Sequence, residues 1–240
     1  MAFIQVFLAG VFFLLFVVTG ALPLPDKPNI IFVHVDSMDG RTALPDSPAL
    51  TPNIDQLASR GVLFQNTYCA SPECVPSRSA LWSGRRTDQT GAWSNGHGLS
   101  ANYPIIMDRV AANGYDTLFI GRHDFLSGSH SLSANLSSWT RAVPDFAIPS
   151  EGRPKASVSD SEEVRVHNGD WEKSDECVRW LHDRQQNKSA SDKPFMLSCG
   201  FVIPHPGYHT SKYWYNKGVN HSAITIPTWL PEDQMHPVQR

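Results

Sequence analysis

The stretch PNIIFVHVDS, residues 28–37, is a continuous apolar run that ends in a carboxylate. A run without polar alternation is typical of a strand that is buried on both faces, as in a parallel sheet. Asp36 then lies at the carboxyl end of the strand, which is the end where open α/β sheets bind their ligands. This stretch therefore predicts a buried strand that carries a site residue.

Strands and helices alternate along the rest of the chain. Helices are predicted for TPNIDQLASRG (51–61), with Thr51 as the cap and Gly61 as the end, for YPIIMDRVAANG (103–114) and for DWEKSDECVRWLHDRQQ (170–186). Strands are predicted for VLFQNTY (62–68) and YDTLFIG (115–121), and the stretch KPFMLSCGFVIPHP (193–206) for a buried strand that opens into a His-Pro loop. Residues 127–169 are predicted to form surface loops. This alternation predicts a layered α/β sandwich with a largely parallel central sheet.

The composition fits one sizeable domain. The chain has 240 residues, 41% of them hydrophobic, and a net charge of -3. Because there is no basic excess, we expect no nucleic-acid partner. Four cysteines are too few for a disulfide scaffold; one bridge is possible, and the sequence leaves its pairing open.

The N-terminus has the pattern of a secretory signal peptide. An apolar segment at residues 6–18 is too short for a stable membrane span, and the small residues Thr19, Gly20 and Ala21 follow it. We expect residues 1–20 to be removed by cleavage near 20–22, although an uncleaved anchor stays open because no Lys or Arg precedes the apolar segment. Sequons at Asn135, Asn187 and Asn220 then predict glycosylation on surface loops.

A punctuated motif surrounds one of the cysteines. The stretch CVPSRSALWSGR, Cys74–Arg85, resembles the signature of the sulfatase family, and PNIIFVHVDS, NGYDTLFIGR and IPHP resemble other stretches of that family. The resemblance implies that Cys74 is oxidised to formylglycine by the formylglycine-generating enzyme during secretion. It also implies one calcium ion, and a chain in which residues 21–240 form only the N-terminal part of the catalytic domain. A chain truncated in this way is expected to be inactive alone.

The resemblance also implies roles for single residues. Asp36 and residue 74 would bind the metal, and residue 74 would also be the nucleophile. Arg78 would hold the aldehyde hydrate, and Arg122 would bind the sulfate. His205 and His236 would bind the sulfate or protonate the leaving group. The stretches DSMDGR, LSGSHSLS, EGRP and MHPV resemble a branch whose substrate is the 2-O-sulfate of glucuronate in heparan-type glycosaminoglycans, which predicts a lysosomal or extracellular enzyme.

Several positions depart from the family pattern or have no assigned role. Ser37 stands where most sulfatases have a second aspartate, Ser83 where threonine is usual, and Arg122 where lysine is usual. Ordinary turn or surface roles are assumed for the remaining polar residues near the motifs, which are His34, Asp39, His123, Asp124 and His130. For His123 and His130 a pocket-lining role stays open.

Two other functions stay open. One is a phosphatase-like member of the same superfamily, although such enzymes keep serine or threonine as the nucleophile. The other is a catalytically dead fragment that binds sulfated glycan.

Overall fold

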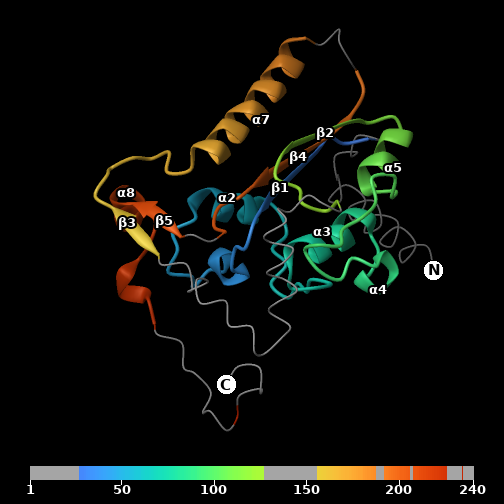
Figure 1. The fold of residues 1–240 in the computed structure, drawn as a ribbon. Coiled ribbons are helices and arrows are strands. Elements are labelled where there is room, and N and C mark those ends of the chain that lie inside the picture. The colour runs from blue at the N-terminus through green and yellow to red at the C-terminus, as the bar shows by residue number, and fades with distance from the viewer. Residues whose placement is uncertain (1–26, 127–155, 188–191, 206–207, 226–233, 235–240) are drawn as a thin grey trace, which may run out of the picture.

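A three-stranded parallel sheet forms the centre of the fold (Figure 1). The computed structural model describes residues 27–126, 156–187, 192–205, 208–225 and 234. The strands are β1 (Ile30–Val35), β2 (Asp116–Gly121) and β4 (Phe195–Phe201), in the order β1-β4-β2. Ile31 pairs with Leu197 and Leu118 pairs with the same Leu197, so the three strands run in register and their carboxyl ends meet at one edge. The predicted parallel sheet is confirmed.

Helices cover both faces of this sheet. On one face α7 (Asn168–Gln186) packs on β2 and β4 through a cluster that includes Cys177, Trp180, Leu181 and Leu197. On the other face Trp82 of α3 (Cys74–Ser83) and Met107 of α5 (Ile106–Ala112) belong to a second cluster. The central strand β4 alternates between the clusters, because Met196 joins the second and Leu197 the first. The layered α/β architecture is therefore confirmed.

A disulfide between Cys177 and Cys199 joins α7 to β4. The pairing that the sequence leaves open is thus settled for these two cysteines, and Cys69 and Cys74 are free thiols. The bridge fixes the helix to the central strand on the face that α7 covers.

Shorter elements complete the described part of the chain. The helix α2 (Pro52–Arg60) begins and ends as predicted, but Thr51 makes no side-chain cap and bonds to the Asp55 carboxylate instead. A small parallel pair, β3 and β5, lies beside α8. The remaining bounds are β3 (Ser157–Ser159), β5 (His209–Ser211), α4 (Thr87–Thr90), α8 (Lys212–Lys217), η1 (Gly40–Ala43) and η2 (His221–Ala223). The prediction of loops throughout 127–169 is therefore wrong at β3, and no strand was predicted at β5.

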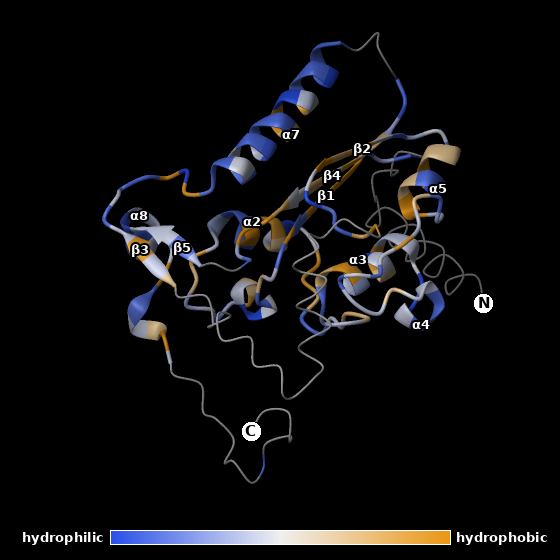
Figure 2. Cartoon of the chain, viewed as in Figure 1, coloured by the Kyte–Doolittle hydropathy of each residue, from blue (hydrophilic) through white to orange (hydrophobic). Residues whose placement is uncertain are grey.

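Two strand predictions differ from the structure. Residues 62–68 form no strand, and Val62, Phe64 and Tyr68 are exposed. β1 is covered on one face only, since Ile31 and Val33 are 52% and 60% exposed. The reason is the path of α7, which lies over β2 and β4 and leaves this face of β1 without a covering element among the described residues. Figure 2 shows the apolar character of the three strands.

Some predicted features lie outside the described residues. They are the signal peptide at 1–20, the sequon at Asn135, His130 and the substrate residue His236. Among the residues that the structure describes, no helix combines the length and the apolar character that a membrane crossing needs.

Candidate active site

Five of the predicted site residues meet at the carboxyl edge of the sheet. Asp36 follows β1, Arg122 follows β2, and His205 comes four residues after the end of β4. Cys74 begins α3, and Arg78 lies one turn further along the same helix. Because the three strands are parallel, their ends bring together side chains that are distant in the sequence.

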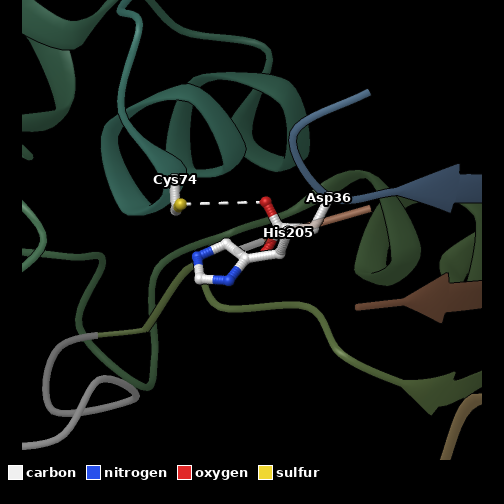
Figure 3. A group of neighbouring side chains, drawn as sticks. All are labelled: Asp36, Cys74 and His205. Carbon is white, nitrogen blue, oxygen red and sulfur yellow. Dashed lines mark hydrogen bonds between the residues drawn. The ribbon is translucent and has the colours of Figure 1, made fainter. Parts of the chain in front are cut away.

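Asp36, Cys74 and His205 form the centre of the site (Figure 3). One ligand atom from each of the three lies within 4.8 Å of the others. The Cys74 thiol donates to Asp36 Oδ1 across 3.8 Å. Asp36 is only 3% exposed, and its Oδ2 accepts no hydrogen bond in the described part of the chain. A buried carboxylate oxygen without a donor is suited to a metal ligand.

Two guanidinium groups surround the Asp36 carboxylate. Arg78 Nη2 lies 3.6 Å from Oδ1, and Arg122 Nε lies 3.4 Å from Oδ2. Arg122 Nε also donates to Asp124 Oδ2 in a very short contact. The two guanidinium groups are balanced in formal charge by the Asp36 and Asp124 carboxylates, so what favours an anion here is their N–H donors and not a net positive charge.

Arg78 is held in place by its other contacts. Its side chain is buried, and Nη1 lies 3.2 Å from both His34 Nδ1 and the carbonyl oxygen of Arg122. An arginine has no acceptor, so His34 Nδ1 must accept from Arg78. Burial, and then the Arg78 guanidinium, lower the pKa of His34 to about 4, which keeps its ring neutral and able to accept at neutral pH. His34 therefore orients Arg78.

The start of α3 places residue 74 but keeps few free donors. The Val75 N–H donates to Asn95 Oδ1 at 3.0 Å, and Pro76 has no N–H. A helix start usually binds anions through free backbone N–H groups. At this helix start the attraction for an anion comes instead from the helix dipole and from Arg78 and Arg122. Burial, and then the Asp36 carboxylate, raise the pKa of the Cys74 thiol, so the unmodified cysteine is a weak nucleophile at neutral pH.

A close approach between two glycines shapes the floor of the site. The Arg122 N–H donates to Gly200 O at 3.0 Å, where β4 passes the end of β2. A Cβ at Gly200 would overlap the Arg122 carbonyl and lie 2.8 Å from His34 Cε1. Gly121 has a φ of +87°, which glycine adopts without strain. Glycines at both positions let the strand ends carrying Arg122 and His205 lie side by side.

Three polar residues contribute more than their assumed ordinary roles. Asp124 pairs with Arg122, His34 orients Arg78, and the His123 ring packs against the His34 ring at 4.9 Å between centroids. The spacing of Arg122 and Asp124 was a signal for the first pair. The His34 contact joins residues 44 positions apart, so no local pattern indicates it. Asp39 bonds to exposed Arg41 and stays an ordinary turn residue.

Two of the three sequon asparagines lie on the surface of the described part of the chain. Asn187 follows the last turn of α7 and Asn220 precedes η2, and both are exposed. Both sites are therefore accessible to a modifying enzyme.

Comparison with known proteins agrees with this geometry. The sequence profile of the sulfatase family matches residues 28–225. Arylsulfatase K from Canis lupus familiaris is 41% identical over 230 residues, and that from Homo sapiens is 40% identical over 227 residues. These alignments cover 89% and 88% of this chain but 42% and 41% of the relatives, so the chain spans about two fifths of their length.

Solved structures show the same fold. A structure titled as a 2-O GAG sulfatase is 26% identical, with a TM-score of 0.50, and covers 86% of this chain and 41% of its own. The phosphonate monoester hydrolase of Agrobacterium radiobacter is 20% identical with a TM-score of 0.56, and covers 79% of this chain and 44% of its own. The profile match extends over most of the chain and includes every element of the central sheet, and the chain therefore belongs to the sulfatase family.

Proposed function

We propose that the protein hydrolyses sulfate esters with a formylglycine nucleophile at residue 74. The observation that carries this proposal is the convergence of Asp36, Cys74 and His205 within 4.8 Å, beside two guanidinium groups. The family membership and the relatives named arylsulfatase K support the same reaction class.

The arginines answer the first difficulty of the reaction, which is charge. A sulfate monoester is an anion and repels a nucleophile until its charge is neutralised. Arg122 offers a planar fork of donors that matches two sulfate oxygens, and its contacts with Asp36 and Asp124 use Nε. Arg78, oriented by His34, screens the nucleophile. We assign Arg122 to the sulfate and Arg78 to the hydrated aldehyde.

A formylglycine nucleophile explains why a cysteine is needed at this position. The formylglycine-generating enzyme would use dioxygen as the oxidant to replace the C–S bond and one C–H bond of Cys74 Cβ by a C=O bond, with the sulfur leaving as sulfide. The resulting aldehyde adds water to form two hydroxyls on one carbon. One hydroxyl oxygen attacks sulfur, and the bond from sulfur to the alcohol oxygen breaks. The second hydroxyl then loses its proton, the Cβ–O bond to the sulfate breaks, and sulfate leaves as the aldehyde forms again. A serine lacks the second hydroxyl and would keep the sulfate.

His205 is the residue that we assign to the leaving alcohol. Its ring lies in the same cluster as residue 74 and the Asp36 carboxylate. Arginine does not give up a proton at physiological pH, so Arg122 is unsuited to this role. A second histidine, His236, remains a candidate substrate residue by resemblance, in the stretch MHPV.

A divalent cation would complete the neutralisation of charge. Sulfatases generally use a metal ion, and we propose one calcium ion because the donor set offers oxygen. The Asp36 carboxylate with its unbonded Oδ2 and a hydroxyl of the modified residue 74 would hold it. Calcium takes roughly six to eight oxygen ligands, so further donors must come from elsewhere in the protein or from water. When bound, the ion would withdraw charge from the sulfate oxygens.

The substrate that we propose is the 2-O-sulfate of glucuronate in heparan-type glycosaminoglycans. The resemblance to arylsulfatase K in the stretches DSMDGR, LSGSHSLS and EGRP supports this choice, as does the structural relative titled as a 2-O GAG sulfatase. A small aryl sulfate with a good leaving group should also react, because it needs less help from an acid.

The proposed compartment is the secretory pathway, ending in the lysosome or outside the cell. It follows from the signal-like segment at residues 1–20, the sequons and the need for the formylglycine-generating enzyme. We expect Asn187 and Asn220 to carry glycans, since both side chains are exposed. Glycosidase treatment should lower the mass of the secreted protein, and substitution of either asparagine by Gln should remove one glycan.

The test is turnover by the complete enzyme, as cells with the modifying enzyme secrete it; residues 21–240 alone are expected to stay inactive. We expect the complete enzyme to release sulfate from an aryl sulfate and to leave the matched aryl phosphate nearly untouched. Cys74→Ala should be inactive, and Cys74→Ser should gain the mass of one sulfo group and stop. Turnover by Cys74→Ala, or faster release of phosphate than of sulfate, would refute the proposal and favour the phosphatase-like alternative.

A further inference from the structure

One carboxylate holds the segment that connects β4 to His205. Asp170, in the first turn of α7, accepts the N–H of Val202 at 2.9 Å and 3.0 Å through its two oxygens. Its Oδ2 also accepts the N–H of Ile203 at 2.8 Å. These two amides follow the last residue of β4 directly, so they are the first backbone donors beyond the strand.

Asp170 is itself fixed by its surroundings. Its side chain is 12% exposed, and its backbone N–H donates to both the carbonyl oxygen and Nδ1 of His167, each at 3.1 Å. Since His167 Nδ1 accepts that N–H, it has no proton to donate to the Asp170 carboxylate at 3.5 Å. The carboxylate is therefore directed at the two amides of the neighbouring segment.

The attachment continues to His205 through one more hydrogen bond. The His205 N–H donates to Val202 O at 2.8 Å. Val202, whose own N–H donates to Asp170, therefore also holds the backbone of His205. The disulfide between Cys177 and Cys199 fixes α7 to the same strand at a second point. The helix and the segment that carries His205 are thus joined on both sides of the strand end.

A general preference for acidic residues at helix starts does not account for this arrangement. That preference is satisfied by a carboxylate that faces solvent near the first turn. Asp170 instead turns both oxygens to the backbone of another element. A neutral side chain or water would satisfy the same amides, and a charged acceptor makes these bonds shorter and stronger. The carboxylate should therefore hold this segment more firmly than a neutral acceptor would.

We propose that Asp170 is a positioning residue that holds His205 at the site. The catalytic role of His205 rests on the proposed function. The hydrogen bonds from Asp170 to the amides of Val202 and Ile203 do not depend on that function. A catalytic group displaced by about 1 Å loses on the order of a hundredfold in rate. Release of the segment should therefore lower kcat while leaving the charge that binds the sulfate in place.

The kinetic test compares variants of the complete secreted enzyme on an aryl sulfate. We expect Asp170→Ala to lower kcat by about tenfold to a hundredfold with KM changed by less than about twofold. Asp170→Asn, which keeps one acceptor oxygen, should lose less. The matched control is Asp175→Asn, on the same helix, where an exposed pair with Arg165 is lost and kcat should not change.

A double-mutant cycle separates positioning from a loss of stability. If Asp170 acts through His205, then Asp170→Asn should have almost no further effect on kcat in a His205→Ala background. Full additivity of the two losses would overturn the proposal, because a destabilised fold would slow both backgrounds equally. A shared loss would support it.

Amide hydrogen exchange tests the grip without any turnover. We expect the amides of Val202 and Ile203 to exchange at least about tenfold faster in Asp170→Asn, while the amide of Leu197 inside β4 keeps its wild-type rate. Unchanged exchange at both amides would overturn the proposal. An inactive complete enzyme would refute the proposed function, and the exchange rates would still decide whether Asp170 holds the segment.

Discussion

Replacement of Arg78 by methionine should destabilise the protein far more than replacement of a surface arginine. Arg78 is 7% exposed, and its Nη2 lies 3.6 Å from Asp36 Oδ1. At that distance two unit charges attract by about 4–5 kcal/mol in a medium with an effective dielectric constant of about 20. The guanidinium also donates to His34 and to the Arg122 carbonyl, and both acceptors would lose their donor.

Two effects reduce this figure. Methionine fills much of the same volume and removes the cost of burying a guanidinium. Arg122 Nε stays 3.4 Å from the Asp36 carboxylate and continues to neutralise it. We therefore expect a net loss of about 2–4 kcal/mol in the free energy of unfolding. The matched control is Arg86→Met, whose pair with Asp88 has side chains 74% and 53% exposed, so that its loss should leave the free energy of unfolding nearly unchanged.

The assay is unfolding in urea with a chelator present, and tryptophan fluorescence monitors the transition. A cycle with Asp36→Asn isolates the charge pair, and Arg78→Met should cost about 1–2 kcal/mol less in that background. Equal losses for Arg78→Met and Arg86→Met would refute the reasoning. An unchanged cost in the Asp36→Asn background would show that the pair contributes nothing and that only packing matters.

Three further predictions concern binding, pH and the disulfide. Arg122→Ala should lower kcat/KM by about a hundredfold in steady-state kinetics, because the pair of charge-assisted hydrogen bonds to the sulfate is lost. Arg122→Lys should keep most of the activity with the same pH profile. A changed pH profile for Arg122→Lys would show instead that position 122 transfers protons. Burial and the Arg78 guanidinium lower the pKa of His34 from 6.5 to about 4, so the unfolded chain binds more protons in that window. The free energy of unfolding should therefore fall as the pH falls from 6.5 to 4, and urea titrations should show a flatter profile for His34→Gln; an equal slope in both would contradict this. Replacement of Cys177 and Cys199 together by serine opens a loop with a sequence separation of 22, which costs about 3 kcal/mol in the entropy account; an unchanged urea midpoint would contradict the bridge.

The core of the sheet could be predicted because its signals are local. The run at β4 is apolar except for Ser198 and is buried on both faces, and the helix α7 carries Cys177, Trp180 and Leu181 on its packed side. Gly114, with a φ of +86°, ends the α5 region as expected of a helix stop. These features depend on periodicity and backbone preference, which the sequence states directly.

The errors arose where burial depends on a partner. β1 has the same apolar pattern as β4, but α7 does not extend over it, and Val33 is left exposed. Residues 62–68 have the composition of a strand, but no strand among the described residues pairs with them. A local pattern indicates that a segment can be buried, and only the neighbouring elements decide whether it is.

The site residues could be predicted from the sequence, but the contacts that orient them could not. The rule that open α/β sheets bind ligands at the carboxyl ends of their strands placed Asp36 at the site, and the resemblance to the sulfatase family added Arg122 and His205. The contacts that orient them were not predictable, because Arg78 with His34 and Asp170 with Val202 join residues 44 and 32 positions apart. Such pairs have no spacing rule in the sequence and follow only from the packing of α3 and α7.

The chemical state of residue 74 distinguishes this proposal from its alternatives. The protein secreted by cells that contain the formylglycine-generating enzyme should be digested, and the peptide that includes residue 74 measured by mass spectrometry. We predict an aldehyde in place of the thiol in most copies, with Arg78→Lys as a variant in which conversion falls because the Cys-X-Pro-X-Arg core is broken. A spectrum that contains only the unmodified cysteine would contradict formylglycine chemistry in this protein.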